Sequence, residues 1–191
     1  MSTESTEYGW IRRTWDSFEP PEGWHAELLA GEIVMQASPS ALHDFIIRNL
    51  VRQVGAPYEA WGERHIRISE RYIPRADAVI VADEDVLLTG NEWPAEIVRV
   101  VVEVVSPGRE AQNRDRRDKR RWYAEAGIPV YVLVDPAAAT WEVLEIHPGT
   151  RLYTETSEGV FGHPIAIAPK GGEAISIDTS TWQPYPQGVP S

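Results

Sequence analysis

The chain has 191 residues, 42% of them hydrophobic, and its 29 acidic residues outnumber its 18 basic ones to give a net charge of −11. This length indicates one domain with a substantial core, and the negative charge disfavours nonspecific binding to nucleic acid unless positive charge is gathered in one place. The lack of cysteine excludes disulfides, thiolate metal sites and cysteine nucleophiles. The sequence shows neither a long apolar run that would predict a membrane span nor a leader that would predict secretion. We therefore expect a cytoplasmic protein without membrane association.

The two ends of the chain differ in composition from the rest. Residues 1–18 form a polar N-terminal segment and residues 183–191 a proline-rich tail, and we expect both to be mobile. Residues 19–182 are expected to form a single domain. Within it, residues 27–37 predict a pair of short strands that turn at Gly31.

A helix is predicted next. Ser38 is placed to cap its N-terminus, with Pro39 as the first helical residue, because serine and proline are favoured at these two positions. The apolar residues recur at helical spacing until Gly55, a residue that commonly follows a helix.

The middle of the chain alternates strands with one helix. Residues 64–69, 77–82 and 97–105 have the composition of strands, and residues 111–126 that of a helix ended by Gly127 and Pro129. A strand at residues 130–134 then predicts a parallel crossover. Four short segments follow that are typical of antiparallel strands, at residues 141–146, 151–156, 162–168 and 173–177. The fold class is therefore α/β, with a mixed sheet flanked by helices and additional antiparallel strands.

Glu103 is the most informative residue because it interrupts a strand that is otherwise nearly all valine. On the alternation of side chains it shares a face with Val101 and Val105. An unpaired buried carboxylate costs several kcal/mol, so something should compensate its charge. A metal ion would do so, and so would an arginine or backbone donors at the end of the strand.

Asp77 opens the strand at residues 77–82, 26 residues before Glu103. Neighbouring strands could bring the two side chains together at one edge of the sheet, and two carboxylates with waters suit a hard cation such as Mg²⁺. Taken singly, Asp77 is more typical of an aspartate at a strand start or in a turn than of a metal ligand.

The helix after Glu103 carries most of the clustered positive charge. Seven basic residues and three acidic ones lie between positions 109 and 121. Spacing places Lys119 on one face with Asp115 and Tyr123, where it could hold a phosphate oxygen or an attacking water, or form an ion pair with Asp115. His43 in the first helix could titrate near neutral pH or serve only in packing. The sequence lacks the motifs of serine hydrolases, P-loop ATPases and zinc peptidases.

Several segments, in this order, are similar to one known family. They are ELLAGEIVMQASPSALHDFI, a strand-start aspartate, and VVVEVVSPGREAQNRDRRDKRRWYAEAGIPVYVLVDP. The chain resembles the Uma-two family from about Trp24 to Trp182, and the most specific part is the stretch from Glu103 to Asp135. This family consists of widespread bacterial proteins regarded as endonucleases with a restriction-endonuclease-like fold.

The resemblance implies an active site of the PD-(D/E)xK type in a metal-dependent endonuclease that hydrolyses DNA. Asp77 and Glu103 would be the acids that hold Mg²⁺ or Mn²⁺, and Lys119 would be the lysine, displaced onto the following helix. The auxiliary residues implied or considered are His43, Glu27 and Asp115, and the arginines expected to contact the nucleic acid are Arg109, Arg114 and Arg116.

Two positions depart from the wider superfamily. Ala76 precedes Asp77, so the PD dipeptide is absent, and Val105 stands where the strand lysine would be. Because proline does no chemistry, the first departure is mild, whereas the second makes activity depend on Lys119. The alternative hypothesis is a catalytically inactive nuclease-fold module that binds nucleic acid or protein, with homodimerisation through its apolar surface as one option.

Overall fold

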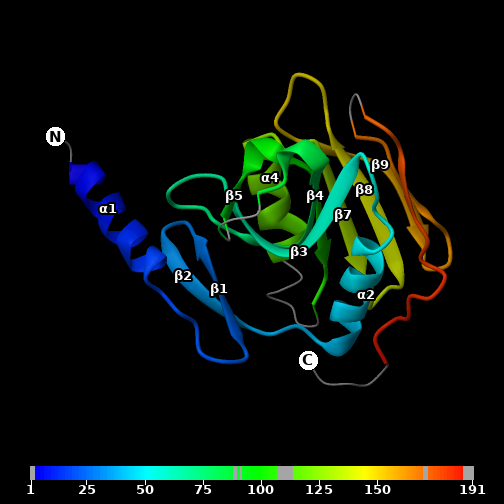
Figure 1. The fold of residues 1–191 in the computed structure, drawn as a ribbon, viewed down its shortest axis with the longest axis horizontal. Coiled ribbons are helices and arrows are strands. Elements are labelled where there is room, and N and C mark those ends of the chain that lie inside the picture. The colour runs from blue at the N-terminus through cyan, green and yellow to red at the C-terminus, as the bar shows by residue number, and fades with distance from the viewer. Residues whose placement is uncertain (1–2, 88–89, 91, 107–113, 170–171, 187–191) are drawn as a thin grey trace.

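The computed structural model describes residues 3–87, 90, 92–106, 114–169 and 172–186. Its centre is a seven-stranded mixed sheet with the strand order β5-β3-β4-β6-β7-β8-β9 (Figure 1). The bounds of these strands are β3 Tyr58–Arg67, β4 Arg75–Ala82, β5 Glu92–Pro94, β6 Val98–Val104, β7 Val130–Asp135, β8 Thr140–Ile146 and β9 Tyr153–Val160.

The predicted parallel crossover is confirmed between β6 and β7, which pair in parallel. The connection contains a π-helical turn, η3 (Arg114–Lys119), that continues into α4 (Arg120–Ala126). As predicted, Gly127 ends this helix, and its φ of 85° is a left-handed conformation that glycine adopts without steric cost. Two single 3₁₀ turns, η1 (Asp83–Asp85) and η2 (Ala95–Ile97), flank β5.

The sheet is buried on both faces, as the valine-rich sequence of β6 predicts. On one face, α2 (Ala41–Val51) packs with Ile46 and Leu50 against Val100, Val102 and Val104. On the other, Tyr123 and Ala124 of α4 pack against Val101 and Val105. Because β6 lies at the centre of the sheet between β4 and β7, its side chains are covered from both sides.

Two small antiparallel sheets complete the fold. The predicted strand pair about Gly31 is confirmed as β1 (Trp24–Leu29) and β2 (Glu32–Ala37), with Gly31 at a φ of 84°. An isolated antiparallel β-bridge between Leu28 and Ile73 pairs β1 with the segment that precedes β4. The second pair is β10 (Ile165–Ile167) with β11 (Ile175–Ile177), which confirms the predicted antiparallel strands near the C-terminus.

The predicted bounds of the helix between Ser38 and Gly55 were wrong. The N-cap of α2 is Ser40, not Ser38, and its hydroxyl accepts a hydrogen bond from the His43 N–H at 3.3 Å. The helix ends at Val51, before Gly55, because Gln53 turns its backbone N–H onto the Leu50 carbonyl and its side chain onto the backbone of Asp178. Contacts to the distant C-terminal segment therefore override the local stop signal.

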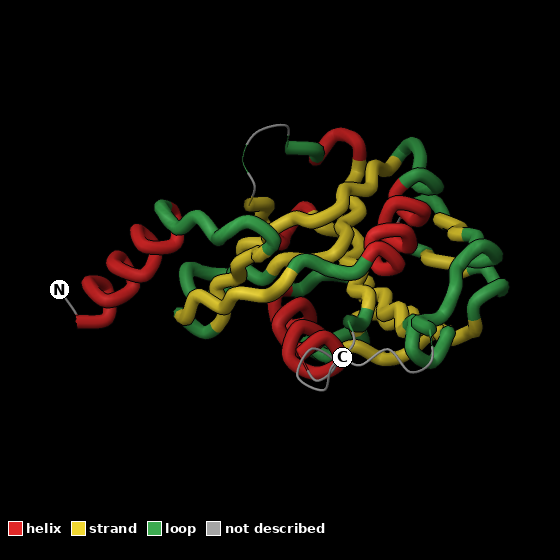
Figure 2. The backbone as a smooth tube through the Cα atoms, turned by 90° about the horizontal axis from the view of Figure 1, so that it is seen from below, coloured by secondary structure: helices red, strands yellow, loops and turns green. Residues whose placement is uncertain are grey.

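Residues near both ends of the chain make contacts with the central sheet and its loops. The N-terminal segment includes a helix, α1 (Thr3–Asp16), that extends from the body of the molecule beside the β1-β2 pair (Figures 1 and 2). Arg12 and Trp15 of α1 both bind the Glu92 carboxylate, at 2.9 and 2.6 Å. In the tail, the Tyr185 N–H donates to the Pro136 carbonyl at 3.0 Å. No helix in the described part of the chain is long and apolar enough to cross a membrane.

Candidate active site

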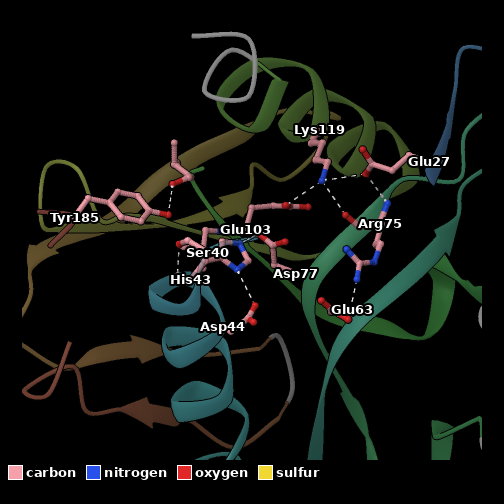
Figure 3. Close-up of polar contacts among 12 residues, drawn as sticks. Glu27, Ser40, His43, Asp44, Glu63, Arg75, Asp77, Glu103, Lys119 and Tyr185 are labelled. Carbon is pink, nitrogen blue, oxygen red and sulfur yellow. Dashed lines mark hydrogen bonds and ion pairs between the residues drawn. The ribbon is translucent and has the colours of Figure 1, made fainter. Parts of the chain in front are cut away.

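Side chains from several strands and helices meet at one end of β4 and β6 (Figure 3). Ala78 of β4 pairs with Val102 of β6, so the adjoining residues Asp77 and Glu103 stand at the same end of two neighbouring strands. The expectation that the two strands lie side by side is therefore met. Asp77 is 19% exposed, whereas Glu103 is 1% exposed, so solvent reaches the centre from the Asp77 side.

The Glu103 carboxylate is held by two side chains from the connection that follows β6. The Lys119 ammonium donates to Oε2 at 3.0 Å, and the Tyr123 hydroxyl donates to Oε1 at 2.8 Å. Burial and the neighbouring Glu103 charge raise the pKa of Tyr123 well above its usual value, so Tyr123 stays a donor. Among the contacts that the structure describes, a lysine and a tyrosine thus compensate the buried charge.

Lys119 also binds a second buried carboxylate, that of Glu27 on β1. The distance from Lys119 Nζ to Glu27 Oε1 is 3.2 Å, and Nζ donates to the Arg75 carbonyl at 2.8 Å. Glu27 in turn accepts hydrogen bonds from the Arg75 N–H at 2.7 Å and from the Gln36 side chain. Through these described contacts of its ammonium, Lys119 joins β1, β4 and β6 into one centre.

Asp77 has a different set of partners from Glu103. Its Oδ2 lies 3.1 Å from His43 Nε2 and accepts a hydrogen bond from the Val104 N–H at 2.7 Å. Burial alone would raise the pKa of Asp77, but the charge and hydrogen bond of His43, the charge of Lys119 and the Val104 N–H together lower it to about 2. Asp77 is therefore a carboxylate at any ordinary pH.

This lowered pKa predicts an acid-dependent loss of stability. Since the pKa of Asp77 falls from 3.8 to about 2 on folding, its contribution of about 2 kcal/mol is complete above pH 4 and disappears as the pH falls to about 2. Denaturant unfolding at a series of acidic pH values should show this loss in the wild type, and Asp77→Asn should lack it. Equal pH dependence in the two proteins would contradict the assignment.

A cleft of about 310 Å³ opens beside Asp77. It lies between α2 and the strands β3 and β4, and its lining residues are His43, Asp44, Ile47, Arg48, Gly62, Glu63 and Asp77. His43 is 5% exposed, so its ring is fixed in the wall of the cleft. A group bound in this cleft would meet Asp77 first, with Glu103 and Lys119 behind it.

The structure does not describe the side chains of four predicted site residues. Arg109 lies outside the described residues, and for Asp115, Arg114 and Arg116 the description covers the backbone of η3 only. Elsewhere in the basic stretch, Lys119 is buried, Arg120 donates to the Tyr153 carbonyl at 3.2 Å, and Arg121 lies 3.8 Å from Glu125. Part of the clustered positive charge therefore serves contacts within the chain.

The donor chemistry of the centre fits a hard divalent cation. Asp77 and Glu103 present carboxylate oxygens from paired strands, the ligand type that Mg²⁺ prefers. Among the residues that the structure describes, no group of three or more histidine, aspartate or glutamate side chains is arranged to hold a metal ion. Cation binding at Glu103 would therefore use water or substrate oxygens as further ligands and would compete with Lys119 for Oε2.

Sequence reasoning missed two charged residues of this region, Arg75 and Glu63. Arg75 precedes Asp77 by two positions on β4, and its guanidinium lies 2.8 Å from the Glu63 carboxylate. The period-two alternation of a strand could have indicated that Arg75 shares a face with Asp77. Nothing in the sequence marks Glu63, whose role depends on the pairing of β3 with β4.

The mixed sheet with a buried carboxylate and lysine centre at the end of neighbouring strands defines an α/β protein of the restriction-endonuclease-like class. A solved structure with a similar fold is the protein described as "a putative nuclease belonging to DUF820" from Anabaena variabilis, with a TM-score of 0.59 and 15% identity over 83% of this chain and 87% of that one. The Uma2 family model, described as "Putative restriction endonuclease", matches residues 14–169, and the chain belongs to this family. No curated protein matches the chain.

Proposed function

We propose that this protein is a metal-dependent endonuclease that hydrolyses phosphodiester bonds in DNA. The observation that carries the proposal is the meeting of Asp77, Glu103 and Lys119 at the end of two neighbouring strands, in a chain of the Uma2 family. The supporting feature is the cleft of about 310 Å³ that gives access to Asp77.

Asp77 and Glu103 would hold the cation, Mg²⁺ or Mn²⁺. The chemistry that a bound divalent cation supplies in such a centre is a lower pKa of a coordinated water and neutralisation of charge on the phosphoryl group. Asp77 is prepared for this role because its lowered pKa keeps it ionised. His43 would act as a positioning residue, since its Nε2 contact of 3.1 Å and the Val104 N–H fix the orientation of the Asp77 carboxylate.

Lys119 would supply the positive charge closest to the reacting phosphate. Its ammonium is committed to Glu27, Glu103 and the Arg75 carbonyl, so donation to the attacking water or to a phosphate oxygen requires exchange of one of these contacts. During this exchange Glu27 would keep the Lys119 ammonium in place, and Tyr123 would keep the Glu103 carboxylate in place. The lysine thereby fills the role left open by Val105 in the strand.

The direct test is a cleavage assay on purified protein. Supercoiled plasmid, linear duplex DNA and a matching RNA duplex are incubated with Mg²⁺, with Mn²⁺ and with EDTA, and the products are resolved on gels. We expect nicking or linearisation of the plasmid with either metal, none with EDTA, and weaker action on RNA. Cleavage that persists in EDTA would contradict metal dependence, and preferential cleavage of RNA would contradict the substrate.

A second candidate is a non-catalytic nuclease-fold module that binds nucleic acid or protein. It is favoured by the engagement of both Glu103 oxygens by Lys119 and Tyr123. Calorimetric titration with Mn²⁺ separates the two proposals: the endonuclease should bind the metal and lose this binding in Asp77→Asn. Absence of binding, or equal binding by the variant, would support the module.

A further inference from the structure

Glu63, which lines the cleft, forms an ion pair with Arg75 next to the proposed centre. Arg75 Nη2 lies 2.8 Å from Glu63 Oε2 (Figure 3), and Glu63 lines the cleft with His43 and Asp77. The Arg75 side chain is 15% exposed and that of Glu63 is 52% exposed. The glutamate is therefore the more solvent-exposed member of the pair.

The backbone of Arg75 is already part of the centre. Its N–H donates to Glu27 at 2.7 Å and its carbonyl accepts from Lys119 at 2.8 Å. These bonds fix where the side chain leaves β4, two residues before Asp77. A substitution of the Arg75 side chain removes the guanidinium while the backbone contacts to Glu27 and Lys119 can persist.

Glu63 has an unusual backbone conformation for its residue type. Its φ is 56°, in the left-handed region, and the pairing of β3 with β4 lapses at this residue between the pairs Gly62↔Ala78 and Arg64↔Ala76. A residue other than glycine in this conformation is strained, and such strain is concentrated at functional sites. The irregularity lies directly across from Asp77 and brings the Glu63 carboxylate to Arg75.

The pair is suited to exchange because its two members differ in exposure. An ion pair with a half-exposed carboxylate is weak: the attraction favours the paired over the separated state by less than about ten-fold. A guanidinium presents a planar fork of donors that matches two phosphate oxygens, and charge-assisted bonds of this kind are the stronger ones. A phosphodiester entering the cleft could therefore displace Glu63.

We propose that Arg75 is a phosphate-binding residue of this centre and that Glu63 occupies the phosphate position when no nucleic acid is bound. The proposal rests on the proposed nuclease function, whose substrate it anchors: the guanidinium would hold a backbone phosphate within reach of Asp77. Arg75 would also give this chain, whose net charge is −11, a positively charged side chain that can bind phosphate. Arg48 of α2 lines the cleft itself and donates to the Asp44 carbonyl at 3.3 Å.

The test measures binding without cleavage. A fluorescein-labelled DNA duplex is titrated with each protein in EDTA, and anisotropy is recorded at several salt concentrations. We expect Glu63→Gln to bind about five-fold more tightly than wild type and Arg75→Gln about ten-fold more weakly. Loss of one phosphate contact in Arg75→Gln should also reduce the slope of log K against log salt by about 0.9, which a merely structural role would not do. Arg75→Lys should retain the slope and lose part of the affinity.

Two matched controls carry the same charge changes outside the cleft. Glu70→Gln and Arg67→Gln alter exposed residues near the turn between β3 and β4, and each should bind within about two-fold of wild type with an unchanged salt slope. The proposal is overturned if Glu63→Gln gains no more than Glu70→Gln, if Arg75→Gln keeps the wild-type slope, or if no protein in the series binds the duplex at low salt. The results are independent of catalysis: absence of metal-dependent cleavage with intact Arg75 and Glu63 effects would reject the nuclease and keep the phosphate site.

Discussion

Replacement of Asp77 by asparagine is expected to reduce metal-dependent DNA cleavage by about a thousand-fold. A cation site that loses one of its two carboxylates loses several kcal/mol of charge stabilisation, and about 4 kcal/mol corresponds to this factor. The fold should survive, because asparagine has the same shape and its amide oxygen can still accept from the Val104 N–H. Glu103→Gln should lower the rate by a similar factor.

The control for this experiment is Asp118→Asn. Asp118 is exposed and adjoins Lys119 in η3, so the variant makes the same charge change near the centre without altering the proposed ligands. Its cleavage rate should stay within about three-fold of wild type. If Asp77→Asn retains more than about a tenth of the wild-type rate while remaining folded, the reaction does not take place at this centre.

Replacement of Lys119 by methionine is expected to lower the free energy of unfolding by about 3–5 kcal/mol, because it leaves Glu27 and Glu103 buried without their common cation. Both carboxylates are at most 1% exposed, so water cannot take over the role of the ammonium. Urea unfolding followed by tryptophan fluorescence would measure the change. Tyr123→Phe, which removes one hydrogen bond to Glu103 and no charge, should cost about 1–3 kcal/mol.

A double variant distinguishes lost charge compensation from lost packing. Glu103→Gln in the Lys119→Met background removes one of the two buried carboxylates that have lost their cation. The double variant should therefore be more stable than the sum of the two single changes predicts. Additive effects, or a Lys119→Met protein within about 1 kcal/mol of wild type, would show that the ammonium is not what stabilises the buried carboxylates.

The regular elements follow from local sequence patterns. The valine-rich stretch around Glu103, the β-branched run after Asp77, and the glycines at 31 and 127 predict strands and turns that the structure contains. These features depend on side-chain periodicity and backbone sterics, which neighbouring residues along the chain determine. The same reasoning identified Glu103 as a buried charge in need of a partner.

The partners themselves depended on tertiary structure. Spacing along a helix offered Asp115, whose side chain is not described, as a counter-charge of Lys119. The described contacts of the Lys119 ammonium include Glu27 on β1 and Glu103 on β6, which helical spacing does not predict. The π-helical turn η3 precedes α4 and carries Lys119 at its end. A desolvated charge is stabilised by whichever groups the fold brings within a few ångströms, and sequence separation does not determine that distance.

The sequence by itself therefore determined the α/β class, the order of most strands, the family resemblance and the presence of a buried acid, because these follow from composition, periodicity and motif order. Only the tertiary structure decided that Lys119 and Tyr123 hold Glu103, that His43 contacts Asp77, and that Glu63 pairs with Arg75. Those contacts join residues from separate strands and helices, so they arise from strand order and register, which local patterns leave open.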